Sequence, residues 1–138
     1  MKKVLVLDSC ALIAQLNDEQ GAENVEQIFL SAQEESNTIL IHAASIAEVY
    51  YDFLKKADLT LAEQFLEDVN NLPLKVVTEI SFDLIKAMGH FKSRYKISFA
   101  DIFVLALAKI SNASIITSDH HEFDIIEASE ELNFEWIR

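Results

Sequence analysis

Four acidic side chains in this sequence lie where a parallel α/β fold would bring them together. Asp8 and Asp119 each follow a short apolar run that is rich in β-branched residues. Glu48 and Asp101 fall within the first turns of two expected helices. Carboxylates that lie close together repel one another and raise one another's pKa, so such a cluster favours a bound cation. Because Mg²⁺ and Mn²⁺ prefer oxygen ligands, the four acids predict a divalent-metal site.

Each acid also has an ordinary structural interpretation when it is taken alone. The spacing Ser45-x-x-Glu48 matches a capping box, and Ser98-x-x-Asp101 is a near match with a shorter acid. Acids in the first turn of a helix also interact favourably with the helix dipole. The two acids at strand ends could cap the helices that follow them. The metal site is favoured by the joint pattern, because strand ends and helix starts share one edge of a parallel sheet.

The elements that would position these acids alternate between strand-like and helix-like segments. The expected strands are Val4–Leu7, Thr38–Ile41, Leu74–Ile80, Ser114–Thr117 and an edge strand Phe134–Ile137. Apolar residues at helical spacing occupy the segments between them. This alternation predicts an α/β fold with a mainly parallel sheet and helices on both faces, in which the segments near residues 3–7, 38–41 and 114–117 run parallel. Ligands of such sheets bind at the carboxyl ends of the strands.

The composition limits the class of protein. A chain of 138 residues fits a single domain spanning residues 1–138, and 51% hydrophobic residues disfavour disorder. One cysteine, Cys10, excludes an internal disulfide framework and favours a reducing, cytoplasmic setting. No signal peptide or membrane span is expected, because no apolar stretch is long enough. The net charge of −12 disfavours a general nucleic-acid binder.

Four motifs around these acids resemble those of a known family. They are LDSCALIA with Asp8, HAASIAEVYYDFLKK with Glu48, ISFADIFVLALA with Asp101, and IITSDHHEFD with Asp119. In this order and at these separations they resemble the PIN-domain ribonucleases, and most closely the VapC-type toxins of bacterial toxin–antitoxin pairs. The similarity covers nearly the whole chain.

This resemblance implies a three-layer α/β/α sandwich with a five-stranded sheet. It implies a Mg²⁺- or Mn²⁺-dependent endoribonuclease that leaves a 5′-phosphate, with Asp8, Asp101 and Asp119 as direct metal ligands. Glu48 would bind the metal through water or orient the attacking water. Thr117 matches a family hydroxyl position near the metal.

The family often carries a further acid after the position of Asp119. Glu122 and Asp124 are both candidates for this role, and the sequence does not choose between them. The family also often has Asn or Ser two residues after its first Asp, where this chain has Cys10. We interpret Cys10 as an inert packing residue, because no His lies nearby in a recognisable arrangement. His120 and His121 are expected to be exposed loop residues rather than zinc ligands.

Partners are predicted on similar grounds. Lys92, Arg94 and Lys96 form a basic patch before Asp101, which is either a solvated helix end or a contact for the RNA backbone. The apolar excess and the family resemblance predict a homodimer. An antitoxin is expected to place a basic segment in or beside the acidic cleft.

Two alternatives to a metal-dependent ribonuclease are considered. A phosphoacceptor signalling domain needs a pair of acids after its first strand, and here Asp8 stands there alone. A catalytically silent PIN-like binding module is compatible with the net charge of −12 and with Cys10, although the intact set of acids argues against it.

Overall fold

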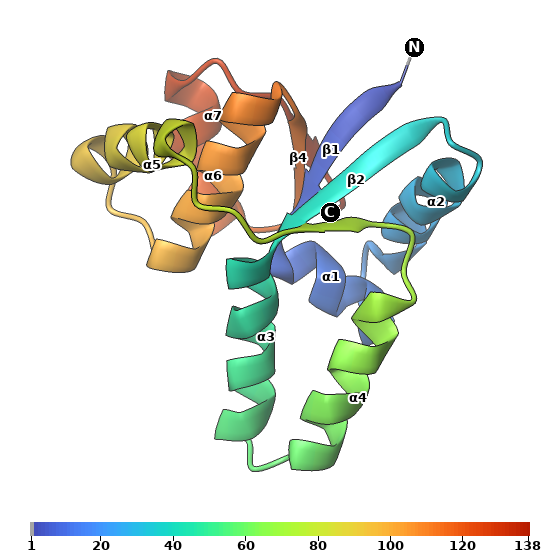
Figure 1. The fold of residues 1–138 in the computed structure, drawn as a ribbon. Coiled ribbons are helices and arrows are strands. Elements are labelled where there is room, and N and C mark those ends of the chain that lie inside the picture. Colours follow the sequence, from blue (N-terminus) through green and yellow to red (C-terminus); the bar gives the residue numbers. More distant parts are fainter. Residues whose placement is uncertain (1) are drawn as a thin grey trace.

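The computed structural model describes residues 2–138, and five parallel strands form its central sheet (Figure 1). The strands are β1 (Lys3–Leu7), β2 (Asn37–His42), β3 (Lys75–Val77), β4 (Ser114–Thr117) and β5 (Phe134–Trp136). Their order across the sheet is β3-β2-β1-β4-β5. The three apolar segments are parallel as predicted, and the pairing of β3 and β5 makes the described sheet parallel throughout.

Helices cover both faces of this sheet, which gives the expected three-layer α/β/α sandwich (Figure 1). The helices of the described residues are α1 (Ser9–Leu16), α2 (Ala22–Gln33), α3 (Ala43–Lys55), α4 (Leu59–Asn70), α5 (Phe82–Arg94), α6 (Phe99–Ser111) and α7 (His120–Ser129). Helices α5–α7 pack on one face and α1–α4 on the other. No helix among residues 2–138 is long and apolar enough to cross a membrane.

The two halves of the core arise from the alternation of side chains along the strands. In β1, Val6 faces α5–α7, whereas Leu5 and Leu7 face the opposite helices. Helix α6 is buried from Asp101 to Ala108, so its sequence is apolar nearly all round. Because this helix is fixed between the sheet and α5, its first turn holds Asp101 at the carboxyl edge of the sheet.

Helix α3 begins differently from the prediction. Its N-cap is His42, whose Nδ1 accepts a hydrogen bond from the Ala44 amide at 3.0 Å. The Nε2 of His42 therefore carries the proton, and it donates a hydrogen bond to the Glu79 carbonyl at 3.0 Å. Ser45 lies inside the helix and is buried, and among the described residues its hydroxyl has no partner. The capping-box interpretation was wrong, because strand β2 continues to His42 and the helix starts directly after it.

Strand β3 is also shorter than predicted. The expected strand Leu74–Ile80 is reduced to Lys75–Val77 at the edge of the sheet. After Val77 the chain leaves the sheet, and the carbonyl of Glu79 accepts the hydrogen bond from His42. The apolar character of Leu74 and Ile80 therefore reflects packing and surface positions outside the sheet ladder.

The turn between α1 and α2 requires glycine at position 21, which predicts a stability effect. Gly21 has φ +99°, and an added Cβ would lie 2.8 Å from the Ile137 carbonyl oxygen. We expect Gly21→Ala to lower the free energy of unfolding by about 1–3 kcal/mol, measured by urea denaturation. The matched control is Gly89→Ala in α5, where the added Cβ meets nothing within 4 Å. That change should stabilise the protein by about 0.5–1 kcal/mol, and equal effects of the two substitutions would contradict the strain argument.

Candidate active site

Asp8 lies directly after β1 and combines a structural role with burial. Its Oδ1 accepts a hydrogen bond from the Ala11 amide at 2.8 Å, so Asp8 is the N-cap of α1. Its Oδ2 accepts a hydrogen bond from the hydroxyl of Thr117, the last residue of β4. The residue is only 1% exposed. The carboxylate is therefore fixed between the ends of two neighbouring strands.

Asp101 and Asp119 reach the same edge from two helix starts. Asp101 lies in the first turn of α6. The N-cap of this helix is Ser98, whose hydroxyl oxygen accepts a hydrogen bond from the Asp101 amide at 3.2 Å. Asp119 is the N-cap of α7, and its Oδ1 accepts a hydrogen bond from the Glu122 amide at 3.2 Å. The amide of Asp119 donates to Thr117 Oγ1 at 2.9 Å, so one threonine contacts both strand-end acids.

Glu48 is held by a residue that the sequence interpretation missed. The hydroxyl of Ser9 donates to Glu48 Oε1 at 2.6 Å and thereby links the start of α1 to α3. Glu48 lies in the second turn of α3 rather than the first, because that helix begins at Ala43. The signal for Ser9 was its place beside Asp8 at a helix start.

The pKa values of two acids indicate a destabilised cluster of charge. Burial and, to a smaller extent, the charges of Asp101 and Asp119 raise the pKa of Asp8 to about 7, although the hydrogen bonds from Thr117 and Ala11 act to lower it. Burial likewise raises the pKa of Asp101 to about 7, reinforced by the charges of neighbouring acids. Within residues 2–138, no Lys, Arg or His forms an ion pair with Asp8, Asp101, Asp119 or Glu48.

Cys10 lies among the same acids and is half-buried. Burial, together with the charges of the four nearby acids, raises the pKa of its thiol to about 12. Because the thiolate is the nucleophilic form, the Cys10 thiol is unreactive at neutral pH. This agrees with its interpretation as an inert residue.

The structure distinguishes the two candidates for a further acid. Glu122 lies close enough to Asp101 for its charge to raise the pKa of that carboxyl. Asp124 instead forms an ion pair with His120 at 2.8 Å, and its side chain is 63% exposed. Of the two, Glu122 is the one whose charge acts on a carboxyl of the acidic edge.

The histidines after Asp119 are exposed as predicted, but they do not lie in a loop. His120 and His121 are the first residues of α7, because Asp119 caps that helix. The ring of His120 stacks on Trp136 with 3.8 Å between the ring centroids. Its two ring nitrogens face Asp124 and the Arg138 carbonyl, which is an arrangement of local packing.

The predicted basic patch is divided between two environments. Lys92, Arg94 and Lys96 are all exposed. The ammonium of Lys92 donates to the Ile97 carbonyl at 3.0 Å, beside the start of α6. Arg94 instead lines a hollow of about 350 Å³ together with Lys109.

The acidic edge fits a hard divalent cation in its donor chemistry. All its donors are oxygens, and two of its carboxylates are buried with no cationic partner among residues 2–138. In the described part of the chain, no three Asp, Glu, His or Cys side chains lie close enough to hold one metal ion as they stand. Binding would thus require side chains at this edge to rotate toward a common point.

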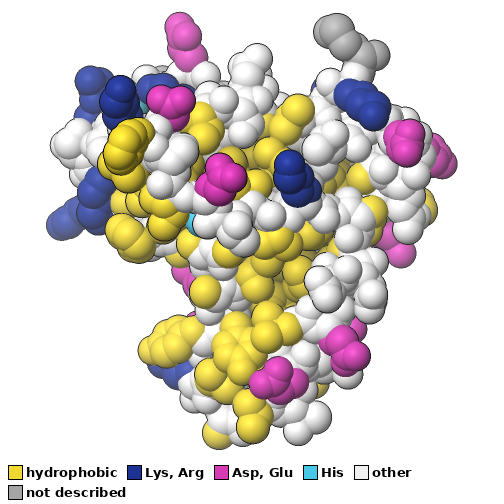
Figure 2. All heavy atoms as spheres, in the orientation of Figure 1, with side chains coloured by type: hydrophobic (Ala, Val, Ile, Leu, Met, Phe, Trp, Pro, Cys, Tyr) yellow, Lys and Arg dark blue, Asp and Glu magenta, His cyan; other side chains and the backbone are white. Residues whose placement is uncertain are grey.

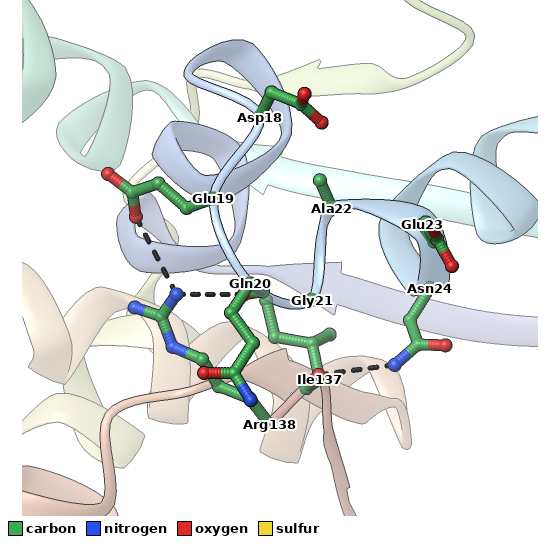
Figure 3. Close-up of a pocket in the computed structure, with 9 residues that line it drawn as sticks. All are labelled: Asp18, Glu19, Gln20, Gly21, Ala22, Glu23, Asn24, Ile137 and Arg138. Carbon is green, nitrogen blue, oxygen red and sulfur yellow. Dashed lines mark hydrogen bonds and ion pairs between the residues drawn. The ribbon is translucent and has the colours of Figure 1, made fainter.

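A separate hollow lies at the turn between α1 and α2 (Figure 3). It has a volume of about 510 Å³. The Arg138 guanidinium donates to the Gln20 carbonyl at 2.8 Å and lies 3.7 Å from the Glu19 carboxylate, and Asn24 donates to the Ile137 carbonyl at 3.1 Å. These interactions tie the end of the chain to the turn between α1 and α2.

Comparisons with known proteins place this arrangement in context. The family model of the PIN domain matches residues 5–128. A chain of the Rickettsia felis VapBC2 structure, bound to a promoter DNA fragment, has a TM-score of 0.76 and 19% identity over 96% of this chain and 98% of that chain. A chain of the DNA-bound VapBC of Salmonella typhimurium has a TM-score of 0.70 and 16% identity over 100% of both chains. A chain of a toxin–antitoxin complex from Klebsiella pneumoniae has a TM-score of 0.68 and 16% identity over 97% of this chain and 98% of that chain. No curated protein matches the sequence.

Proposed function

The chain belongs to the PIN-domain family, and from this we propose that it is a Mg²⁺- or Mn²⁺-dependent endoribonuclease of the VapC type, the toxin of a toxin–antitoxin pair. The observation that carries the proposal is the pair of buried carboxylates, Asp8 and Asp101, at the carboxyl edge of the sheet. Their charges have no cationic partner among residues 2–138, which is costly unless a metal ion supplies one.

We assign the direct metal ligands to Asp8, Asp101 and Asp119. Each carboxylate is attached to the end of a strand or the start of a helix, so its backbone is rigid. Thr117 orients Asp8 through its hydroxyl and also accepts the amide of Asp119, which fixes two ligands relative to each other. Glu122 lies beside Asp101 and adds negative charge to the site.

The cleavage step would be in-line attack of water on a phosphodiester of RNA. The water oxygen would form a bond to phosphorus while the bond to the 3′ oxygen breaks, and the 3′ oxygen would take a proton from solvent, which leaves a 3′-hydroxyl and a 5′-phosphate. The bound cation supplies Lewis-acid polarisation of the phosphate and lowers the pKa of a bound water. Glu48 is assigned to orient the attacking water and take its proton. The Ser9 hydroxyl occupies Oε1 of Glu48, which leaves Oε2 free to accept a hydrogen bond from that water.

Exposed apolar side chains on a helical hairpin support protein partners. Helices α3 and α4 project from the sheet as an arm (Figure 1), and hydrophobic side chains gather on it (Figure 2). The exposed apolar residues of this arm are Tyr51, Leu54, Leu59, Leu61 and Leu66. We propose that the chain is a homodimer in the cytoplasm and that an antitoxin binds it with a basic segment beside the acidic edge. A monomer mass in sedimentation at micromolar concentration would contradict the dimer.

The proposal is tested by cleavage of single-stranded RNA by the purified protein. We expect cleavage with Mg²⁺ or Mn²⁺ and its loss in EDTA, followed by recovery when the metal is restored. Cleavage that persists unchanged in EDTA would reject the metal mechanism. If no RNA is cleaved under any of these conditions, the alternative of a catalytically silent PIN-like binding module replaces the proposal.

A further inference from the structure

Positive charge is concentrated in one part of this acidic protein. The α5–α6 hairpin, residues 81–111, contains five Lys or Arg against two Asp and so carries a formal charge of +3. The other 107 residues carry −15. Figure 2 shows Lys and Arg side chains gathered over α5, at the left of the view. This separation of charge gives a polyanion one surface that it can approach.

Within the described part of the chain, the cations of the hairpin are exposed and keep their charge unpaired, although Lys92 donates to the Ile97 carbonyl and Lys109 lies over the ring of Phe91. All five are exposed, and among residues 2–138 none of them forms an ion pair with a carboxylate. They are Lys86, Lys92, Arg94, Lys96 and Lys109.

Two acids lie close to Arg94 and Lys109, and one of them is already engaged. Glu130 and Glu131 line the same hollow as Arg94 and Lys109. Both oxygens of Glu130 accept hydrogen bonds, one from His90 and one from the Tyr95 hydroxyl. The pKa of Glu130 is lowered, because these interactions and the nearby charge of Lys109 outweigh the effect of its burial. Glu130 therefore serves to hold α7 against the hairpin.

An exposed aromatic ring lies where the hairpin meets the acidic edge. Phe99 is the first residue of α6, two residues before Asp101, and it is 67% exposed. The rings of Phe99 and Phe103 pack edge to face, with 5.3 Å between their centroids. Phe103 in turn packs against the ring of His42, with 4.5 Å between the two ring centroids. Phe99 is thus a supported ring with an open surface, which suits stacking by a nucleobase.

We propose that the α5–α6 hairpin binds single-stranded RNA, with its exposed cations contacting phosphates and Phe99 stacking on a base next to Asp101. This inference rests on the proposed function, since it assigns the side from which the substrate reaches the acidic edge. A charged surface with an aromatic platform is the usual means of binding single strands without reading their sequence. An acidic protein segment would use the cations but would not require the aromatic ring.

Binding is tested separately from cleavage, by fluorescence anisotropy of a labelled single-stranded RNA of about 12 nucleotides in EDTA at low salt. Phe99→Ala should weaken binding by about five- to a hundredfold, and Phe99→Trp should restore it. The matched control is Phe82→Ala, because Phe82 is the first residue of α5 and is 83% exposed. Asp83, the residue after Phe82, lines a hollow together with Lys109. Lys109 follows Asp101 by eight residues, or about 12 Å along α6, so Phe82 lies near the end of the hairpin that is far from Asp101. Phe82→Ala should leave binding unchanged.

The cations are tested by a pair of double variants. Arg94→Ala with Lys96→Ala should weaken binding and reduce the slope of log affinity against log salt by about 1.4, the value for two phosphate contacts. The control combines Lys55→Ala and Lys56→Ala, which remove the same charge at the end of α3. An equal loss in both double variants would mean general attraction by charge and would overturn the proposal.

The remaining outcomes separate this inference from the proposed function. Equal affinity for duplex RNA, or binding of a poly-glutamate peptide at the hairpin in place of RNA, would reject a single-strand site. Normal binding and cleavage by the Phe99 and Arg94/Lys96 variants would overturn the hairpin assignment and leave the nuclease intact. Hairpin-dependent binding by a protein that never cleaves RNA would support the site and reject the nuclease.

Discussion

Purified protein carrying Asp8→Asn is expected to lose RNA cleavage by a factor on the order of 100 or more in Mg²⁺ or Mn²⁺. Asn keeps the size of Asp and an oxygen that can accept the Ala11 amide, so the N-cap of α1 survives. It removes the negative charge that a metal ligand must supply. The protein should remain folded by circular dichroism, and in EDTA it should be more stable than wild type, because one member of a repelling cluster is gone.

The matched control for this variant is Asp124→Asn. Asp124 is an exposed carboxylate that pairs with His120 and makes no contact with the acidic edge among the described residues. Its loss should change the cleavage rate by no more than about twofold, which is within the range of surface substitutions. If Asp8→Asn cleaves RNA as fast as Asp124→Asn, Asp8 is not a metal ligand.

In EDTA, the protein is expected to become less stable as pH rises from about 4 to about 7. The pKa of Asp8 is about 7 in the folded protein and 3.8 in its ordinary state. In this window the folded state keeps a proton that the unfolded state has lost, so the free energy of unfolding falls with pH. The destabilisation caused by Asp8 is absent below the ordinary pKa of 3.8 and complete above the folded pKa of about 7. Its upper limit is about 4 kcal/mol.

The measurement is urea denaturation in EDTA at several pH values across this window. In wild type and Asp124→Asn the free energy of unfolding should decrease with pH. In Asp8→Asn the decrease should be smaller but not absent, because Asp101 keeps its own raised pKa. Added Mg²⁺ should stabilise wild type most at the alkaline end, where the carboxylates are ionised. An identical pH profile for wild type and Asp8→Asn would show that the buried carboxyl does not govern this dependence.

The architecture could be predicted where the sequence pattern follows from burial alone. Strands β1, β2 and β4 are covered on both faces, so each is a continuous apolar run that is recognisable without a structure. Edge strand β3 has exposed residues, and its limits depend on where the chain must turn toward α5. Helix α3 begins one residue after a histidine whose capping role depends on a carbonyl from a distant segment. Periodicity contains no information about such a contact.

The acidic edge could be predicted because topology alone brings strand ends and helix starts together. The different surroundings of Glu122 and Asp124 could not be predicted, because they depend on which face of α7 each side chain occupies. The hydrogen bond between Ser9 and Glu48 joins residues 39 positions apart, and the place of Ser9 beside Asp8 does not identify its partner. The basic residues before Asp101 lie close in sequence, but their positions on α5 direct Lys92 and Arg94 to different surroundings.

The strand order also governs how this protein is made by a ribosome. The first strand synthesised is central in the sheet, and its partner β4 ends at Thr117. More than four fifths of the chain must emerge before the Thr117 hydroxyl can reach Asp8, and Asp119 follows only then. A nascent or prematurely terminated chain therefore lacks a complete set of acids. The site that we propose for metal binding is therefore completed only late in synthesis.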